Sequence, residues 1–271
     1  MSAQYTVRFQ DLRIEGIAAA TLASLPESFC PASQPTASNT EQQPDVVILS
    51  GHAGWTRRAL DQVNFGTPGI VVVHPVPEDT AALQHATNAR KTTVVLDHRW
   101  ASNPALVAEA AQALNEYAEP SVLLDSVATA AVGTDPGELF SEQVTGVVRV
   151  SGPLQKVRIL RTDSHGYSAS AQLANGAPAA LQGVLTNARS AVLTVNLLTS
   201  DGGVQLSLPE PAVAAPATVR ITNSDGERLL PTLYESAHRA SWRRLYQHLQ
   251  QRTSAPDLDD FAALAHNFFS H

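Results

Sequence analysis

Histidine, serine and arginine side chains follow the ends of three short apolar segments in this 271-residue chain. Ser50 ends the run DVVILS and precedes Gly51 and His52, His74 follows GIVVV, and Arg99 follows TTVVLDH. Imidazole can take up or release a proton near neutral pH, whereas a histidine that follows a strand can also simply cap the strand end. These residues together indicate a cleft that could bind a small molecule.

Helical patterns separate the three apolar segments. They extend from about Trp55 to Asn64 and from about Glu78 to Arg90. Short buried runs of β-branched residues joined by helices are typical of a parallel sheet covered on both faces. Residues 45–100 are therefore predicted to form a doubly wound, Rossmann-like sheet.

The first 44 residues predict one further strand and one helix. YTVRFQ at residues 5–10 is typical of a strand, and apolar residues then recur at helical spacing up to Pro26. Residues 30–44 are rich in Pro, Ser, Thr, Asn and Gln, which predicts a surface loop.

The pattern changes after a predicted helix from about Asn103 to Tyr117. Apolar residues then alternate with polar ones, which predicts antiparallel strands joined by tight turns, and two amphipathic helices close the chain. We therefore expect a mixed α/β and α+β chain of two domains. Residues 1–119 would form a shortened Rossmann-like domain, and residues 120–271 a domain with an open antiparallel sheet and two terminal helices.

Composition limits the classes of function. The formal net charge is −7 with acidic and basic residues interspersed, which argues against a nucleic-acid-binding surface. Cys30 is the single cysteine, so a disulfide within the chain and a cysteine-based zinc site are excluded, and a cytoplasmic location is expected. No segment reaches the roughly 18 apolar residues of a membrane span. The scattered histidines lack carboxylates at ligand spacing, so no metal site is predicted.

Residues 45–100 resemble the second half of the nucleotide domain of the Gfo/Idh/MocA oxidoreductases. A strand of the family's DaVvIatP type begins at Asp45, Val73-His74-Pro75 stands at the family's E-K-P motif, and Arg99-Trp100 matches its closing Arg-aromatic pair. The run ANGAPAAL at 174–181 and the helix YESAHRASWRRLYQHL at 234–249 are similar to the family's substrate domain. The resemblance implies NAD or NADP binding, and oligomer contacts through the second domain's antiparallel sheet.

The dinucleotide fingerprint of that family is largely absent. The motif G-x-G-x-x-G lets the backbone approach the pyrophosphate, and its three glycine positions align with Asp11, Arg13 and Gly16. The acidic residue expected to bind the ribose has no counterpart in CPASQPTASN. The second strand could survive as SFCPAS, whereas the helix and strand that would follow it are missing.

Both catalytic positions implied by the resemblance are also replaced. His74 stands where the lysine of E-K-P would support proton transfer, and neither Lys91 nor Lys156 occupies an equivalent position. The histidine-bearing D-x-G-x-H motif of the substrate domain is absent, and its nearest counterpart, residues 125–129, could equally be an ordinary strand.

Three hypotheses follow. The leading one is a non-catalytic binding or assembly subunit that forms a homo-oligomer or heteromer through the antiparallel sheet. The second is an active NAD(P)-dependent oxidoreductase on a sugar, inositol or related polyol, with His74 as acid or base. Its candidate cofactor-binding residues are Gly16, Ser50, Gly51, His52, Pro75 and Arg99. The third is a protein that binds a small molecule in the same cleft without redox chemistry.

Overall fold

The computed structural model describes residues 4–10, 15–32, 43–106, 109–213, 215–231 and 233–269. By its internal contacts the chain divides into two compact units. The first contains residues 1–98 and 238–265, and the second contains residues 99–237 and 266–271. This division differs from the expected boundary after residue 119, because residues 99–119 group with the second unit and most of the terminal helical region groups with the first.

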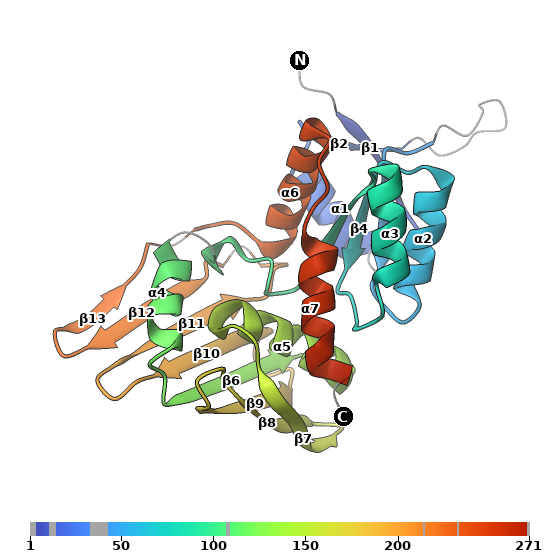
Figure 1. Cartoon of the computed structure of the whole chain (residues 1–271). Helices are drawn as coiled ribbons and strands as arrows, with labels where there is room; N and C mark the ends of the chain where they lie inside the picture. The colour runs from blue at the N-terminus through green and yellow to red at the C-terminus, as the bar shows by residue number, and fades with distance from the viewer. Residues whose placement is uncertain are drawn as a thin grey trace. The chain divides into compact units, whose positions relative to one another are not determined.

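The first unit contains a five-stranded parallel sheet (Figure 1). Its strands are β1 (Tyr5–Phe9), β2 (Phe29–Pro31), β3 (Val46–Ser50), β4 (Gly69–Val73) and β5 (Thr93–Asp97). Their order is β2-β1-β3-β4-β5, and every neighbouring pair is parallel. This is the classic six-stranded order 3-2-1-4-5-6 without its outermost strand, as expected for a shortened Rossmann-like sheet.

The strand at SFCPAS is confirmed. β2 pairs in parallel with β1, with Phe29 opposite Tyr5. Cys30 and Pro31 therefore belong to a strand and not to the predicted loop, whose residues 33–42 lie outside the described part of the chain.

Helices cover both faces of this sheet. The helices α1 (Glu15–Ala23) and α6 (Ala237–Gln251) share one hydrophobic cluster with the sheet. A second cluster, formed by the alternate strand residues, includes side chains of α2 (Trp55–Phe65), α3 (Ala81–Arg90) and α7 (Asp257–Phe269). All five residues of β3, β4 and β5 are buried, as expected for strands covered on both sides.

The packing of α6 and α7 corrects the expectation that both belong with the antiparallel sheet. Trp242 of α6 is fully buried and packs edge-on against Phe29 of β2, with ring centroids 5.3 Å apart. Phe261 of α7 packs edge-on against Trp55 of α2 at 5.7 Å. The apolar sides of these helices fill the two faces of the parallel sheet, and nothing in their sequence periodicity specifies which sheet they cover.

The second unit contains an eight-stranded sheet. Its strands are β6 (Leu123–Ala130), β7 (Gln155–Asp163), β8 (Gly166–Gln172), β9 (Pro178–Leu185), β10 (Val192–Leu198), β11 (Gly203–Pro209), β12 (Thr218–Asn223) and β13 (Gly226–Leu229). The order is β13-β12-β11-β10-β6-β9-β8-β7. The sheet is mixed and not purely antiparallel, because β6 and β9 run parallel while the other neighbouring pairs are antiparallel.

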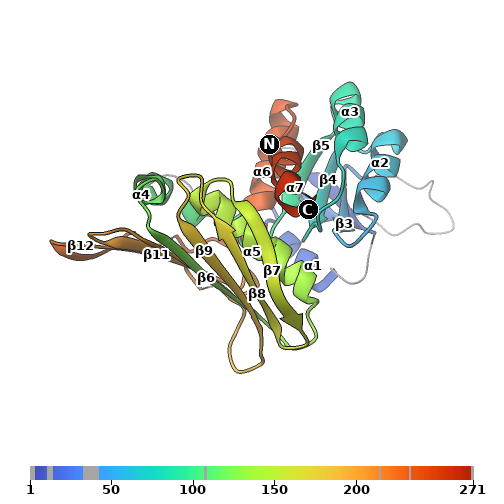
Figure 2. The same ribbon diagram turned by 60° about the horizontal axis from the view of Figure 1, so that its bottom comes forward.

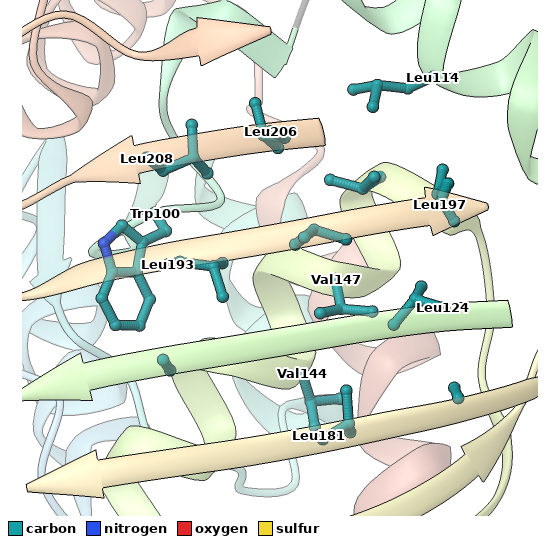
Figure 3. Packing of buried hydrophobic residues seen from close by; sticks show 14 of the residues in the cluster. Trp100, Leu114, Leu124, Val144, Val147, Leu181, Leu193, Leu197, Leu206 and Leu208 are labelled. Atoms are coloured by element: carbon teal, nitrogen blue, oxygen red, sulfur yellow. The ribbon is translucent and has the colours of Figure 1, made fainter. Parts of the chain in front are cut away.

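One face of this sheet is covered by α4 (Glu109–Ala118) and α5 (Pro136–Ser151), as Figure 2 shows for α5. A short 3-10 turn, Pro104–Leu106, precedes α4. Figure 3 shows Val144 and Val147 of α5 above Leu124 and Leu181 of the central strands. Helix α5 is not among the elements predicted from the sequence.

The start of α5 carried a recognisable signal. The carboxylate of Asp135 accepts hydrogen bonds from the backbone N–H groups of Gly137 and Glu138, at 2.8 and 3.0 Å, and Pro136 occupies the first turn. This is a standard N-cap followed by an early proline. Within the described residues, no helix is long and apolar enough to span a membrane.

Candidate functional site

The strand ends of the first unit bring together five of the predicted site residues. Backbone hydrogen bonds join the segments that follow β3, β4 and β5. Gly51 N donates to Val73 O at 2.7 Å, Val76 N donates to Gly51 O at 2.8 Å, and His74 N donates to Asp97 O at 3.0 Å. Ser50, Gly51, His52, His74 and Pro75 therefore lie at one edge of the parallel sheet, where ligands of such folds bind.

Gly51 has a structural reason to be glycine. A Cβ atom at this position would lie 2.3 Å from Pro75 Cα and 2.5 Å from the carbonyl carbon of His74. Because these neighbours are backbone atoms, they cannot move aside as a flexible side chain could. The segments after β3 and β4 therefore contact each other through bare backbone.

His74 lies next to a buried pair that the sequence analysis did not identify. Its ring centroid is 5.5 Å from that of His238, at the start of α6. His238 Nδ1 donates to Asp97 Oδ2 at 2.8 Å, and the two side chains are only 3% and 1% exposed. His74 itself is partly exposed and has a left-handed backbone with φ of 52°, which is uncommon for a residue other than glycine.

The charge balance of Asp97 depends on these histidines. Burial alone would raise the pKa of its carboxyl group, but the charge of His238 and their hydrogen bond outweigh that effect. The charge of His74 and the Ser241 hydroxyl act in the same direction, so the pKa of Asp97 lies below its ordinary value. The arrangement keeps a carboxylate ionised beneath a partly exposed imidazole, which suits proton transfer at His74.

Two charged side chains, Arg58 and Glu78, form hydrogen bonds with the backbone of the loop after β3. The Arg58 guanidinium donates to the carbonyl oxygens of Ser50 and His52, at 3.0 and 2.8 Å, and to that of Ala53. Arg58 therefore binds this loop, whereas its neighbour Arg57 is exposed.

The other charge is the carboxylate of Glu78, which occupies the N-terminus of α2. It accepts hydrogen bonds from the backbone N–H groups of Gly54 and Thr56 and from the Thr56 hydroxyl, the last at 2.8 Å. A helix N-terminus attracts anions because its free N–H groups and its dipole favour negative charge. At α2 a side chain of the protein already fills that place.

The cofactor fingerprint can be followed only at its last position. Asp11 and Arg13 lie outside the described residues. Gly16 lies in α1, and a Cβ atom added there would meet no described atom within 4 Å. In the dinucleotide fingerprint, the third glycine allows a helix to pack closely on a strand. Such close packing is not observed at Gly16 among the described residues.

The remaining candidates have separate surroundings. Arg99 is the first residue of the second unit, where its guanidinium lies over the Trp100 ring and 4.0 Å from a Glu210 oxygen. His98 is buried and stacks on Phe261 with centroids 6.0 Å apart. Residues 125–129 lie in the ordinary strand β6. Among the residues with described positions, no group of three or more His, Cys, Asp or Glu side chains could hold a metal ion.

Asp97 and His238 were missed for different reasons. Asp97 ends a buried strand, so its position at the sheet edge was readable, but strand-end carboxylates are common. His238 is 141 positions away along the chain. No local pattern places a residue at the start of α6 beside the end of β5.

Sequence comparison finds no match among protein-family models and none among curated proteins. Solved structures do match. One is KijD10, a 3-ketoreductase from Actinomadura kijaniata in complex with NADP, with 11% identity and a TM-score of 0.70 over 98% of this chain and 95% of that chain. An oxidoreductase from Sinorhizobium meliloti matches with 12% identity and a TM-score of 0.71, over 100% of this chain and 96% of the other.

A dehydrogenase from Chromobacterium violaceum is similar in the same way, with 12% identity and a TM-score of 0.69 over 98% of this chain and 93% of that chain. At such low identity the likeness establishes the fold and not the activity. It agrees with the Rossmann-like parallel sheet and separate second sheet described above. The chain therefore shares the fold of these solved structures, a Rossmann-like parallel sheet with a separate second sheet.

Proposed function

We propose that this oxidoreductase-like protein is a non-catalytic subunit that does not bind NAD(P) and acts through assembly. The replacement of two fingerprint glycines by Asp11 and Arg13 carries the proposal, because the fingerprint positions are those that approach the pyrophosphate. The loop after β3 supports it. Its carbonyl groups are bound by Arg58 and the N–H groups at the start of α2 by Glu78, so α2 offers no open helix end as a substitute phosphate site.

Titration with NADH and NADPH tests the first half of the proposal. Fluorescence and calorimetry on the purified full-length protein should give no binding or only millimolar affinity. Micromolar affinity for either nucleotide would overturn it.

The surface proposed for assembly is the uncovered face of the eight-stranded sheet. Ser126 and Ala128 of β6 are buried beneath the helices, whereas Asp125 and Val127 between them are only partly buried. The middle of this face is largely uncharged, whereas the outer strands continue its rows to Arg158 and Arg161 of β7 and to Arg220 of β12. Neighbouring strands place mostly Ser, Thr, Gln, Asn and Val side chains across it: Ser168, Gln182, Val127, Thr194 and Ser207 in one row, and Ser170, Ala180, Asp125, Asn196 and Gln205 in the next.

Two side-chain contacts tie the second row together. Asn196 Nδ2 approaches Asp125 Oδ2 at 3.4 Å, and Gln205 Nε2 donates to Asn196 Oδ1 at 3.0 Å. The weakly charged middle of this face suits a partner with the same composition, because core positions of interfaces are depleted in charged residues. We assign it to a second copy of the chain, related by two-fold symmetry.

Light scattering after size-exclusion chromatography tests the dimer. The wild-type protein should have the mass of two chains, and Thr194→Arg, which adds a charge to the middle of the face, should have the mass of one. Asn64→Arg adds the same charge on the exposed side of α2 and should remain dimeric. A wild-type protein that is monomeric at micromolar concentration would contradict this assignment.

One observation favours the alternative, an active NAD(P)-dependent oxidoreductase on a sugar, inositol or related polyol. His74 stands beside the buried His238–Asp97 pair, and the Asp97 carboxylate would stabilise a positive charge gained by His74 in proton transfer. The same nucleotide titration separates the two functions. If micromolar binding were found, His74→Gln would be expected to reduce kcat with little effect on nucleotide affinity.

A further inference from the structure

The second unit has a pocket of its own at one end of the eight-stranded sheet. Its volume is about 340 Å³, within the range of about 300–1,000 Å³ that is usual for small-ligand sites. The segments that follow β6 and β11 and the turn between β9 and β10 line it, together with Arg99. All of its lining residues belong to the second unit, and among them only Arg99 is also a candidate cofactor-binding residue.

Arg99 presents a positioned cation to this pocket. Its side chain is 19% exposed, and its guanidinium lies over the fully buried ring of Trp100 with 5.6 Å to the ring centroid. The nearest Glu210 oxygen is 4.0 Å away, too far for a hydrogen bond. The Trp100 ring therefore orients the guanidinium of Arg99. Because Glu210 is too far away to accept a hydrogen bond from it, N–H donors of the guanidinium are available to a ligand.

Arg189 adds a second guanidinium from the turn between β9 and β10. That turn is held in place by its own side chains, since Val132 N donates to Asn187 Oδ1 at 3.1 Å and Ala188 N donates to Thr186 Oγ1 at 3.1 Å. Arg189 is exposed and has no hydrogen bond or ion pair with any residue that the structure describes. The pocket thus carries two cations against one carboxylate, Glu210.

The polar lining of the pocket defines the ligand more narrowly. Thr134 and Ser190 contribute hydroxyl groups to it, and the Glu210 carboxylate is an acceptor for hydroxyl donors. A bare inorganic anion would satisfy the arginines but be repelled by Glu210. A neutral polyol would satisfy Glu210 but leave the excess positive charge unbalanced.

We propose that this pocket binds a small hydroxylated organic anion. Its carboxylate or phosphate group lies between Arg99 and Arg189, and its hydroxyl groups lie against Glu210, Thr134 and Ser190. Arginine suits the charged end because its planar guanidinium binds carboxylate and phosphate oxygens in pairs.

Calorimetry on the full-length protein tests the assignment with four probes: gluconate, glucose 6-phosphate, glucose and inorganic phosphate. At least one of the two hydroxylated anions should bind ten times more tightly than both glucose and inorganic phosphate. Comparing gluconate with glucose 6-phosphate distinguishes a carboxylate from a phosphate as the anionic group.

Two variants locate the binding. Arg189→Gln removes an exposed guanidinium and should weaken the preferred anion at least tenfold, whereas Arg57→Gln, an equally exposed arginine of α2, should leave affinity unchanged. Glu210→Gln should lower the ratio of the affinity for the hydroxylated anion to the affinity for inorganic phosphate. The proposal is overturned if neither anion binds at millimolar concentration, if inorganic phosphate binds equally well, or if Arg189→Gln keeps wild-type affinity.

Discussion

Replacing Asp97 with asparagine tests the charge balance at the carboxyl edge of the parallel sheet. Asparagine keeps the shape of the side chain but removes the negative charge that accepts the 2.8 Å hydrogen bond from His238. Both residues are almost fully buried, and removing one partner of a buried pair costs about 3–5 kcal/mol. The amide oxygen can still accept a hydrogen bond worth about 1 kcal/mol. We therefore expect a loss of about 2–4 kcal/mol in the free energy of unfolding at neutral pH.

The effect of Asp97→Asn should depend on pH in a defined direction. The pKa of Asp97 is lowered in the folded protein. Its stabilising contribution is therefore complete above the unfolded-state pKa of about 3.9 and declines as the pH falls through the lower folded-state value. The difference between wild type and variant should be constant at neutral pH and shrink below about pH 4.

Urea unfolding followed by tryptophan fluorescence measures this difference, since Trp55 and Trp242 are buried in the same unit. Asp61→Asn, an exposed carboxylate of α2, is the matched control and should change stability by less than about 0.5 kcal/mol. In a double-mutant cycle with His238→Asn, the two substitutions should be strongly non-additive. A loss below about 1 kcal/mol, or additive effects, would refute the reasoning.

Further substitutions probe close packing in each unit. Gly51→Ala places a Cβ 2.3 Å from Pro75 Cα, so we expect at least about 1–3 kcal/mol of destabilisation in urea. Gly16→Ala, in the open part of α1, should instead be neutral or stabilise by about 0.5–1 kcal/mol. Tyr167→Phe removes the 2.6 Å hydrogen bond from its buried hydroxyl to Gln143 Oε1, and should cost about 1–3 kcal/mol because a buried acceptor loses its donor. Equal stability of Gly51→Ala and Gly16→Ala would contradict the packing argument.

The parallel sheet was predictable because its signal is local. Strands β3, β4 and β5 are continuous apolar runs, and each is buried along its whole length, so composition and burial agree without any knowledge of distant residues. The adjacency of Ser50, Gly51 and His74 follows from the same rule, since parallel strands present their carboxyl ends at one edge.

Most of the incorrect or missing predictions concern contacts between segments that are far apart in the sequence, which the periodicity of a single segment does not reveal. The amphipathic pattern of α6 and α7 predicts an apolar face but not its partner, and these helices cover the parallel sheet of the first unit. Helix α5 was missed although Asp135 and Pro136 mark its start and Phe140, Val144 and Val147 recur at helical spacing. His238 reaches the site only through the long-range placement of α6.

A glycine can allow close contact with a ligand or with another segment of the same chain, and the sequence alone does not distinguish these two roles. Gly51 was a candidate cofactor contact, yet the backbone that it closely approaches is that of His74 and Pro75. Arg58 and Glu78 then bind the polar groups of the same loop. Charges of the chain itself therefore bind the polar groups of this loop, whereas Arg99 and Arg189 line a pocket in the second unit. We therefore expect a small anion to bind at Arg99 and Arg189 in the second unit and not at the carboxyl edge of the parallel sheet.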